Sequence, residues 1–217
     1  MTGAVDRAFA TVRIVEANVS MGGNRLAPAN GDTPVHTCEL HEGDKICLNR
    51  SVHFENMRLE CAIESCPCGN RCCNRQLQLG ATLEIAVVDC GRKGVGVITL
   101  EDITEGCLVG EYVGEVLGRE DAQLRSQLYR NGRHFYMMQN SADGVIDATQ
   151  IGGRMRFVNH SCDPNCQVEK WCVRGQERCG VFAIRDVAAG DEITINYSFH
   201  SFGGEVRFST YGAVLPV

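Results

Sequence analysis

The chain has 217 residues, a formal net charge of −6, 44% hydrophobic residues and 22% charged residues. This composition argues against a disordered chain and a membrane protein, and its acidic balance argues against a domain that binds DNA through a basic face. The length suits one compact domain with a smaller appended module, and an acidic surface suits a basic peptide as partner. Since residues 1–35 show no apolar stretch followed by a cleavage site, we expect an intracellular protein.

The first part of the chain lacks any hydrophobic periodicity and then becomes rich in cysteine. Residues 1–35 contain many turn formers, so we expect a loose lead-in. Residues 36–80 are too short and polar to hold a core without metal. Seven of the 13 cysteines lie between Cys38 and Cys73. Close cysteines on turns, without a secretory signal, predict zinc ligands rather than disulfides. For most of the other six, a small buried hydrophobic residue is the favoured interpretation.

From residue 81 the pattern changes to short β-branched runs separated by glycine, which are typical of strands. One helix is predicted over 119–130, where Leu124 and Leu128 stand four residues apart among charged residues and form a narrow apolar stripe. Strands are predicted at 82–88, 94–100, 108–117, 134–139, 145–147, 179–186 and 192–199. Many short strands and 24 glycines predict a β-rich α+β domain over 81–202.

Four motifs follow one another in this domain. They span 92–97 (Arg-Lys-Gly-Val-Gly-Val), 110–116 (Gly-Glu-Tyr-Val-Gly-Glu-Val), 156–166 (Arg-Phe-Val-Asn-His-Ser-Cys-Asp-Pro-Asn-Cys) and 190–197 (Gly-Asp-Glu-Ile-Thr-Ile-Asn-Tyr). Their order and content resemble the SET domain of protein lysine methyltransferases, and the last two motifs are the most specific. The resemblance implies a β-rich SET fold of short strands with a pseudoknot-like C-terminal segment, preceded by a small zinc-binding module.

The segments around this domain narrow the resemblance. The string from Cys66 to Arg75 resembles the associated-with-SET (AWS) zinc module, and 172–175 with 199–202 resemble the absent-small-or-homeotic-discs branch, whose members methylate lysine 36 of histone H3. The resemblance covers 38–202. It implies S-adenosylmethionine as cofactor, the histone H3 tail in nucleosomes as partner and chromatin in the nucleus as location. Neither sequence-specific DNA binding nor a membrane is expected.

The chemistry of lysine methylation explains why aromatic residues belong in these motifs. A lysine amine has a pKa of about 10.4, so only about one in a thousand is neutral and reactive in water at pH 7. A narrow aromatic channel beside a sulfonium cation raises that fraction, because desolvation and like charge both disfavour the ammonium form. The available walls are Tyr112, Phe135, Tyr136 and Tyr197. The transfer then needs in-line alignment rather than acid–base chemistry.

The resemblance assigns roles to individual residues. It places the Tyr197 hydroxyl where the methyl group passes, and it makes Tyr112 and Tyr136 members of the lysine channel. The residues implied around the cofactor are Lys93, Gly94, Val95, His134, Phe135, Tyr136, Asn159 and His160. Glycine lets the backbone approach a ligand, and Asn159 offers both amide and carbonyl groups to it. Taken singly, the tyrosines also fit as core aromatics and His160 as a core histidine.

The metal ligands implied by the resemblance are only partly regular. They are Cys38, Cys47, Cys61, Cys66, Cys72 and Cys162. Cys68 and Cys73 are not counted among the ligands, because they fall at positions where relatives with the same string have residues that do not bind zinc. The family has four cysteines upstream of Cys61 where this chain has two, and His36, His41 and His53 are possible substitutes, since imidazole binds zinc well. One zinc ion is therefore expected in the module, and a second stays open.

The C-terminal residues and two alternative functions complete the expectations. Residues 203–217 diverge from the family's post-SET segment, whose cysteines join the one matching Cys162 around another zinc ion, so we expect weak activity without such a segment. One alternative is a SET-like module that binds a histone peptide without catalysis, and another is an enzyme that methylates a non-histone lysine. Ile195, two residues before Tyr197, offers space for dimethylation or beyond.

Overall fold

A computed structural model of the chain describes residues 3–20, 58–64, 66–129, 136–141, 143–197, 199–202 and 206–209. The expectations for Cys38, Cys47, His134 and Phe135, and for the three histidines upstream of Cys61, lie outside these residues. The described part of the chain confirms a β-rich fold with few helices. None of its helices has the length and apolar character needed to cross a bilayer.

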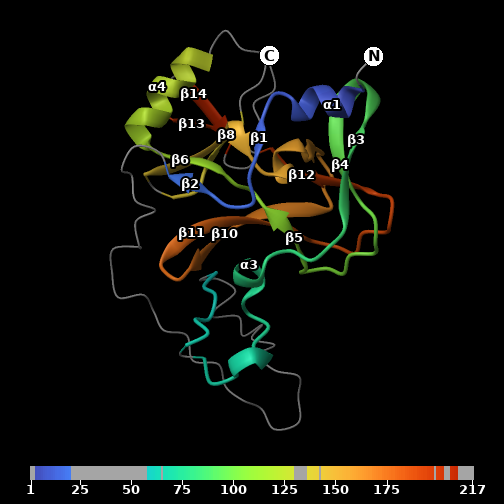
Figure 1. Cartoon of the computed structure of the whole chain (residues 1–217), viewed down its shortest axis with the longest axis vertical. Helices are drawn as coiled ribbons and strands as arrows, with labels where there is room; N and C mark the ends of the chain where they lie inside the picture. Colours follow the sequence, from blue (N-terminus) through green and yellow to red (C-terminus); the bar gives the residue numbers. More distant parts are fainter. Residues whose placement is uncertain are drawn as a thin grey trace.

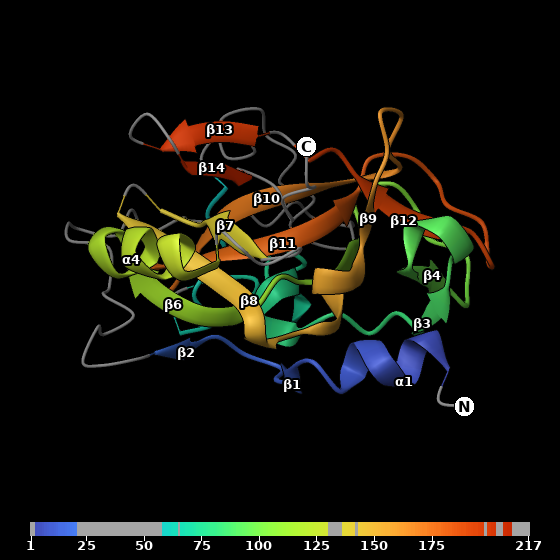
Figure 2. The same cartoon turned by 90° about the horizontal axis from the view of Figure 1, so that it is seen from above.

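Three sheets make up the described fold, and Figures 1 and 2 show them from two directions. The first sheet joins β3 (Ile85–Asp89), β4 (Val95–Thr99), β12 (Glu192–Ile195) and β9 (Asn159–His160) in that order. The second joins β10 (Cys166–Val173), β11 (Gln176–Ala183) and β5 (Leu108–Glu111). The third runs β13 (Phe199–Phe202), β14 (Val206–Ser209), β7 (Met137–Gln139), β8 (Gly144–Gly152), β6 (Gly114–Gly118) and β2 (Val19–Ser20), with β1 (Arg13–Ile14) also on β8.

The main core lies between these sheets, and residues from all three meet in it. Val97, Val109, Ile146, Val181 and Ile193 are fully buried there, each on a different strand. Their β-branched side chains suit strands that are covered on both faces. The short apolar runs of the sequence therefore reflect strands packed on two sides, without a polar alternation.

Strands β6 and β8 approach each other closely at Gly114. A Cβ atom on Gly114 would lie 2.5 Å from the backbone oxygen of Asp147, so only glycine fits. The register of the ladder shifts between Gly114 and Glu115, as in a β-bulge. The predicted strand over 108–117 is accordingly two strands, β5 and β6, and the break between them carries Tyr112.

The predicted helix is present as α4 (Arg119–Tyr129), but the predicted apolar stripe is wrong. Leu124 and Leu128 are 62% and 81% exposed, whereas Ala122 and Ser126 are buried. The helix packs through small residues because Arg125, on the same side, reaches acidic groups of β6 and β8. Electrostatic contacts with the sheet thus determine which face is buried.

The start of the chain is more regular than the expected lead-in. Helix α1 (Ala4–Phe9) lies beside β3 and β4, as Figure 2 shows. The centre of its Phe9 ring is 5.3 Å from the centre of the Phe157 ring. Strands β1 and β2 then pair in parallel with β8 and β6. Two-residue strands leave no periodicity in a sequence, which is why they were not predicted.

The hairpin of β10 and β11 contains a strand that the sequence analysis did not predict. Its turn is Arg174-Gly175, with φ of +51° and +76°, and Val173 faces Gln176 across it. Two central residues with positive φ are the mark of the tight hairpin turn that matches strand twist. The Arg-Gly pair was thus a usable signal for β10.

The described residues 58–64 and 66–75, called the cysteine segment below, attach to the lower end of this hairpin in Figure 1. Leu59 pairs with Cys172 in an isolated parallel bridge, and the Glu60 amide donates to the Cys172 oxygen at 3.0 Å. The Glu60 carboxylate is buried and accepts the backbone amides of Leu77 at 2.5 Å and Gln78 at 3.1 Å, at the start of α3 (Gln76–Leu79). One acidic side chain therefore joins the cysteine segment to the chain that leads into the sheets.

Replacing Glu60 by glutamine should lower the free energy of unfolding by about 2 kcal/mol, because hydrogen bonds to a buried charged group are lost. Glu64 is the matched control, since it pairs with Arg174 on an exposed surface. The substitution Glu64→Gln should change the free energy of unfolding by less than about 0.5 kcal/mol. Chemical denaturation of the two variants and the unchanged chain measures both values. Equal changes in the free energy of unfolding of the two variants would show that Glu60 does not join the cysteine segment to the sheets.

Candidate active site

Two sequence motifs that lie far apart in the chain come together through β9 and β12. These strands pair in parallel, with Asn159 opposite Thr194 and His160 opposite Ile195. The amide of Ser161 extends the pairing by donating to the Ile195 oxygen at 3.0 Å. The Tyr197 amide then donates to His160 Nδ1 at 2.9 Å. His160 is therefore a hydrogen-bond acceptor that holds the backbone of the 190–197 motif at Tyr197.

The three tyrosines expected in a lysine channel form one cluster. The Tyr112 hydroxyl donates to the Tyr136 backbone oxygen at 3.3 Å, and the Tyr197 hydroxyl donates to the Val158 oxygen. Burial raises the pKa of Tyr112 and of Tyr197, and the neighbouring tyrosines raise both further. Both hydroxyls are therefore neutral hydrogen-bond donors at physiological pH.

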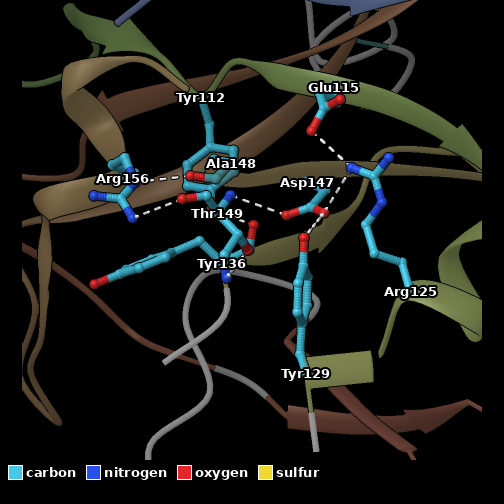
Figure 3. A network of polar contacts seen from close by, with 9 residues as sticks. All are labelled: Tyr112, Glu115, Arg125, Tyr129, Tyr136, Asp147, Ala148, Thr149 and Arg156. Carbon is cyan, nitrogen blue, oxygen red and sulfur yellow. Dashed lines mark hydrogen bonds and ion pairs between the residues drawn. The ribbon is translucent and has the colours of Figure 1, made fainter. Parts of the chain in front are cut away.

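A network of polar groups lies beside Tyr112 and Tyr136, as Figure 3 shows. Asp147 is 0% exposed and lies at its centre. Its Oδ2 accepts Arg125 Nη1 and the Tyr129 hydroxyl, both at 3.1 Å, and its Oδ1 accepts the Thr149 amide at 2.9 Å. Arg125 also reaches Glu115 at 2.6 Å. Buried charges are tolerated when they are paired and hydrogen-bonded in this way.

The network reaches Tyr136 through strand β8. Thr149 Oγ1 accepts the Tyr136 amide at 2.9 Å, and the Tyr136 oxygen accepts the Ala148 amide at 2.7 Å. The Arg156 guanidinium lies 3.8 Å from the centre of the Tyr136 ring. Sequence reasoning missed Arg125, Asp147 and Arg156, because a single charged residue inside a helix or strand shows no pattern that reveals its partners. The dipeptide Asp147-Ala148 after an apolar run was the only local hint of a buried acid.

A second group, at the β3–β4 turn, contains four of the residues implied around the cofactor. Gly94 has φ of +82°, a conformation that favours glycine, and it follows Lys93 in this turn. Asn159 Nδ2 donates to the Val95 oxygen at 3.2 Å and to Glu192 Oε1 at 2.8 Å. Lys93 Nζ donates to Glu192 Oε2 at 2.7 Å. The structure thus brings Lys93, Gly94, Val95 and Asn159 together around Glu192, which was not predicted.

Gly96 shows how tightly these side chains are gathered. A Cβ atom there would lie 2.6 Å from Cys90 Sγ, 2.7 Å from Asn159 Nδ2 and 2.9 Å from Glu192 Oε1. The space that glycine leaves is therefore occupied by the side chains that hold Asn159. The second glycine of the motif serves this packing, whereas the first permits the turn.

The charge of Glu192 is stabilised by its partners. Burial opposes ionisation, but the hydrogen bonds from Lys93 and Asn159 outweigh it, so the pKa of Glu192 is lowered. The ionised form is thus the one that holds the turn.

The cysteines of the expected zinc module form a buried cluster. The Sγ atoms of Cys61, Cys66 and Cys72 all lie within 4.8 Å of one another. Cys68 is buried in the same cluster, whereas Cys73 is exposed. Asn74 Nδ2 donates to Cys61 Sγ at 3.3 Å, as expected for a group that supports a thiolate. Cys162 is exposed, with its Sγ 3.5 Å from His160 Nε2.

Known proteins resemble this chain over most of its length. The family described as "SET domain" matches residues 94–198. Histone-lysine N-methyltransferase ASHH2 from Arabidopsis thaliana is 34% identical over 197 residues, which cover 88% of this chain and 11% of that protein. The histone-lysine N-methyltransferase of Mycosarcoma maydis named H3 lysine-36 specific is 36% identical over 163 residues, 74% of this chain and 16% of that protein.

A solved structure has the same fold. A chain of the Chaetomium thermophilum Polycomb Repressive Complex 2 bound to GSK126 superposes with a TM-score of 0.65 and 28% sequence identity, over 74% of this chain and 24% of that chain. The chain spans less than a fifth of the length of the Arabidopsis thaliana and Mycosarcoma maydis relatives.

Changing Glu192 to glutamine should destabilise the protein by about 1 kcal/mol at pH 7, because the hydrogen bonds to a charged group weaken. The folded-state pKa of Glu192 is lowered, so its stabilising contribution is complete above the unfolded-state pKa and is lost as the pH falls through the folded-state value. The difference in unfolding free energy between the variant and the unchanged chain should therefore shrink below about pH 4. Denaturant unfolding at several pH values, with Glu105→Gln as an exposed control, measures this. A difference that grows on acidification would contradict the assignment.

Proposed function

The chain belongs to the SET-domain family, and from that premise we propose that it is an S-adenosylmethionine-dependent lysine methyltransferase acting on lysine 36 of histone H3. The observation that carries the proposal is the meeting of Tyr112, Tyr136 and Tyr197 beside the paired motifs of β9 and β12. Three phenol rings gathered beside a buried core are suited to a dry channel for a lysine side chain. Such a channel disfavours the ammonium form of the substrate.

The role proposed for Tyr197 is orientation at the reacting amine. Its ring is nearly buried, its backbone is held by His160, and its hydroxyl is neutral because burial raises its pKa. A neutral hydroxyl that donates its proton to the Val158 oxygen can accept a further hydrogen bond without moving. Because the transfer depends mainly on alignment, a fixed group contributes more than an acid or base.

The cofactor proposal rests on the group around Glu192. When bound, S-adenosylmethionine supplies a methyl group on a positively charged sulfur. The backbone at Gly94 offers polar groups without a side chain, and Asn159 is held by two hydrogen bonds, so the donor set suits the polar ends of that molecule. The residues proposed to hold it are Lys93, Gly94, Val95, His134, Phe135, Tyr136, Asn159 and His160.

The substrate proposal rests on the relatives and on charge. Relatives that share most of this chain's length include one named H3 lysine-36 specific. The net charge of −6 suits a basic peptide such as a histone tail. We place the protein on chromatin in the nucleus for the same reason.

A structural zinc ion is proposed for the cysteine cluster. Three buried thiols within 4.8 Å of one another match the tetrahedral sulfur geometry that zinc prefers. We propose Cys61, Cys66 and Cys72 as three ligands, with an upstream ligand such as Cys38 or Cys47 completing the set. Cys162 lies beside His160 in a different part of the chain, so we assign it to a separate site.

The substitution Tyr197→Phe should leave the fold and cofactor binding intact and lower turnover by about 100-fold or more, because one fixed hydroxyl is removed. Its control is Tyr129→Phe, which removes a part-buried hydroxyl that donates to Asp147. That control should change turnover by less than about threefold, since it acts only on stability. Calorimetric cofactor binding and methyl transfer to nucleosomes, read by mass spectrometry at H3 lysine 36, test the pair. Unchanged turnover in Tyr197→Phe would overturn the role of Tyr197, and transfer only to other lysines would overturn the substrate.

The substitution Cys66→Ser should release zinc and lower the thermal midpoint, because small metal modules derive much of their folding free energy from the ion. Cys73→Ser is the matched control, since Cys73 is exposed and lies outside the group of three. Elemental analysis of protein purified without chelator gives the zinc content of both variants. A full zinc content in Cys66→Ser would show that Cys66 is not a ligand.

A further inference from the structure

Arg156 is a buried cation in contact with the tyrosine cluster. It lies on the 3-10 helix η3 (Arg154–Phe157) and is only 5% exposed. Its Nε donates to the Ala148 oxygen at 2.8 Å and its Nη2 to the Thr149 oxygen at 3.4 Å. The guanidinium covers the Tyr136 ring at 3.8 Å, as Figure 3 shows. It is thus held by the same two residues of β8 that hold the Tyr136 backbone.

The charge of Arg156 has no local counter-ion in the described part of the chain. Asp147 is the acidic group that interacts electrostatically with Arg156, but both Asp147 oxygens are engaged, with Arg125 and Tyr129 on one side and the Thr149 amide on the other. Backbone oxygens and an aromatic face stabilise the guanidinium without cancelling its charge. Arginine stays protonated even when burial lowers its pKa, as it does here.

The titratable groups around Arg156 are few. Tyr112 lies between β5 and β6, Tyr136 precedes β7, and Asp147 is on β8. Tyr197 and Glu192 act on the cluster from β12 and the residues after it. Burial raises the pKa of Tyr112 and of Tyr197, and the carboxylates of Asp147 and Glu192 are each paired with a basic side chain. Arg156 is therefore the buried charge without an ion-pair partner among these groups.

We propose that Arg156 is a positioning residue with an electrostatic role: it fixes the Tyr136 ring and keeps the substrate lysine neutral. The inference rests on the proposed function, in which Tyr136 lines the lysine channel. A fixed positive charge behind one wall of a dry channel disfavours a second positive charge inside it. The ammonium form of the substrate is thereby destabilised, and the neutral amine is the form that transfers.

The experiment compares binding of two H3 tail peptides, one with lysine at position 36 and one with norleucine, a neutral side chain of similar shape. S-adenosylhomocysteine fills the cofactor site, so that no turnover occurs. In Arg156→Gln the affinity for the lysine peptide relative to the norleucine peptide should rise by about tenfold at pH 7, equivalent to about one pKa unit. Arg156→Lys, which keeps the charge, should restore the ratio of the unchanged chain.

If Arg156 had a purely structural role, its replacement would weaken the binding of both peptides equally. The ratio of the two affinities would then stay unchanged, and that result would overturn the proposal. Arg156→Met, with a similar stem and no charge, serves as the second neutral variant if the glutamine variant does not fold. Val173→Ala, in a separate core cluster beside the cysteine segment, controls for lost stability and should leave the ratio unchanged.

Turnover gives an independent reading of the same effect. The pH dependence of kcat should move upward by about one pH unit in Arg156→Gln and return in Arg156→Lys, because a higher pH is then needed to deprotonate the bound lysine. A profile that does not move would contradict the electrostatic role. Absence of methyl transfer by the unchanged chain would overturn the proposed function itself, and with it this inference. If the unchanged chain is active but the ratio of peptide affinities does not change in the variants, the inference alone is overturned.

Discussion

The parallel pairing of β9 with β12 is the contact on which the candidate site depends. Two residue pairs, Asn159 with Thr194 and His160 with Ile195, join motifs that are distant in the chain. The pairing places Asn159 beside Glu192 and the β3–β4 turn, and it lets His160 accept the Tyr197 amide. Such a short ladder is weak alone, so the surrounding core must hold it. The buried side chains of all three sheets do so.

Buried charge is the second feature of the site, and it is organised in two ways. Around Asp147, Arg125 and Tyr129 satisfy the carboxylate, so that the cluster is a fixed support. Arg156 instead has backbone oxygens and an aromatic ring as partners, so its field reaches the tyrosines. The first arrangement fixes the positions of the side chains, whereas the second also places a positive electrostatic potential at the tyrosines. Desolvation makes both effects larger than they would be at the surface.

Specific contacts in the described part of the chain link the cysteine segment to the sheets. The buried Glu60 and the bridge at Cys172 link them, and the three clustered thiols lie just beyond. Because such a small segment has little core of its own, a bound metal would add rigidity beside Cys172, near the turn of the hairpin of β10 and β11. The stability of one part therefore affects the other.

The sequence by itself determined the β-rich class, helix α4, most strands of the sheets and the motif residues Tyr112, Asn159 and Tyr197, because local patterns and spacing encode these. It did not determine which face of α4 is buried, since Leu124 and Leu128 obey helical periodicity yet lie in solvent. Nor did it indicate α1, the two-residue strands, or the roles of Asp147, Arg156 and Glu192. Those depend on partners that are distant in the chain and on desolvation, which exist only after the sheets have packed. Tertiary structure alone decided them, because a charge acquires its role from what surrounds it.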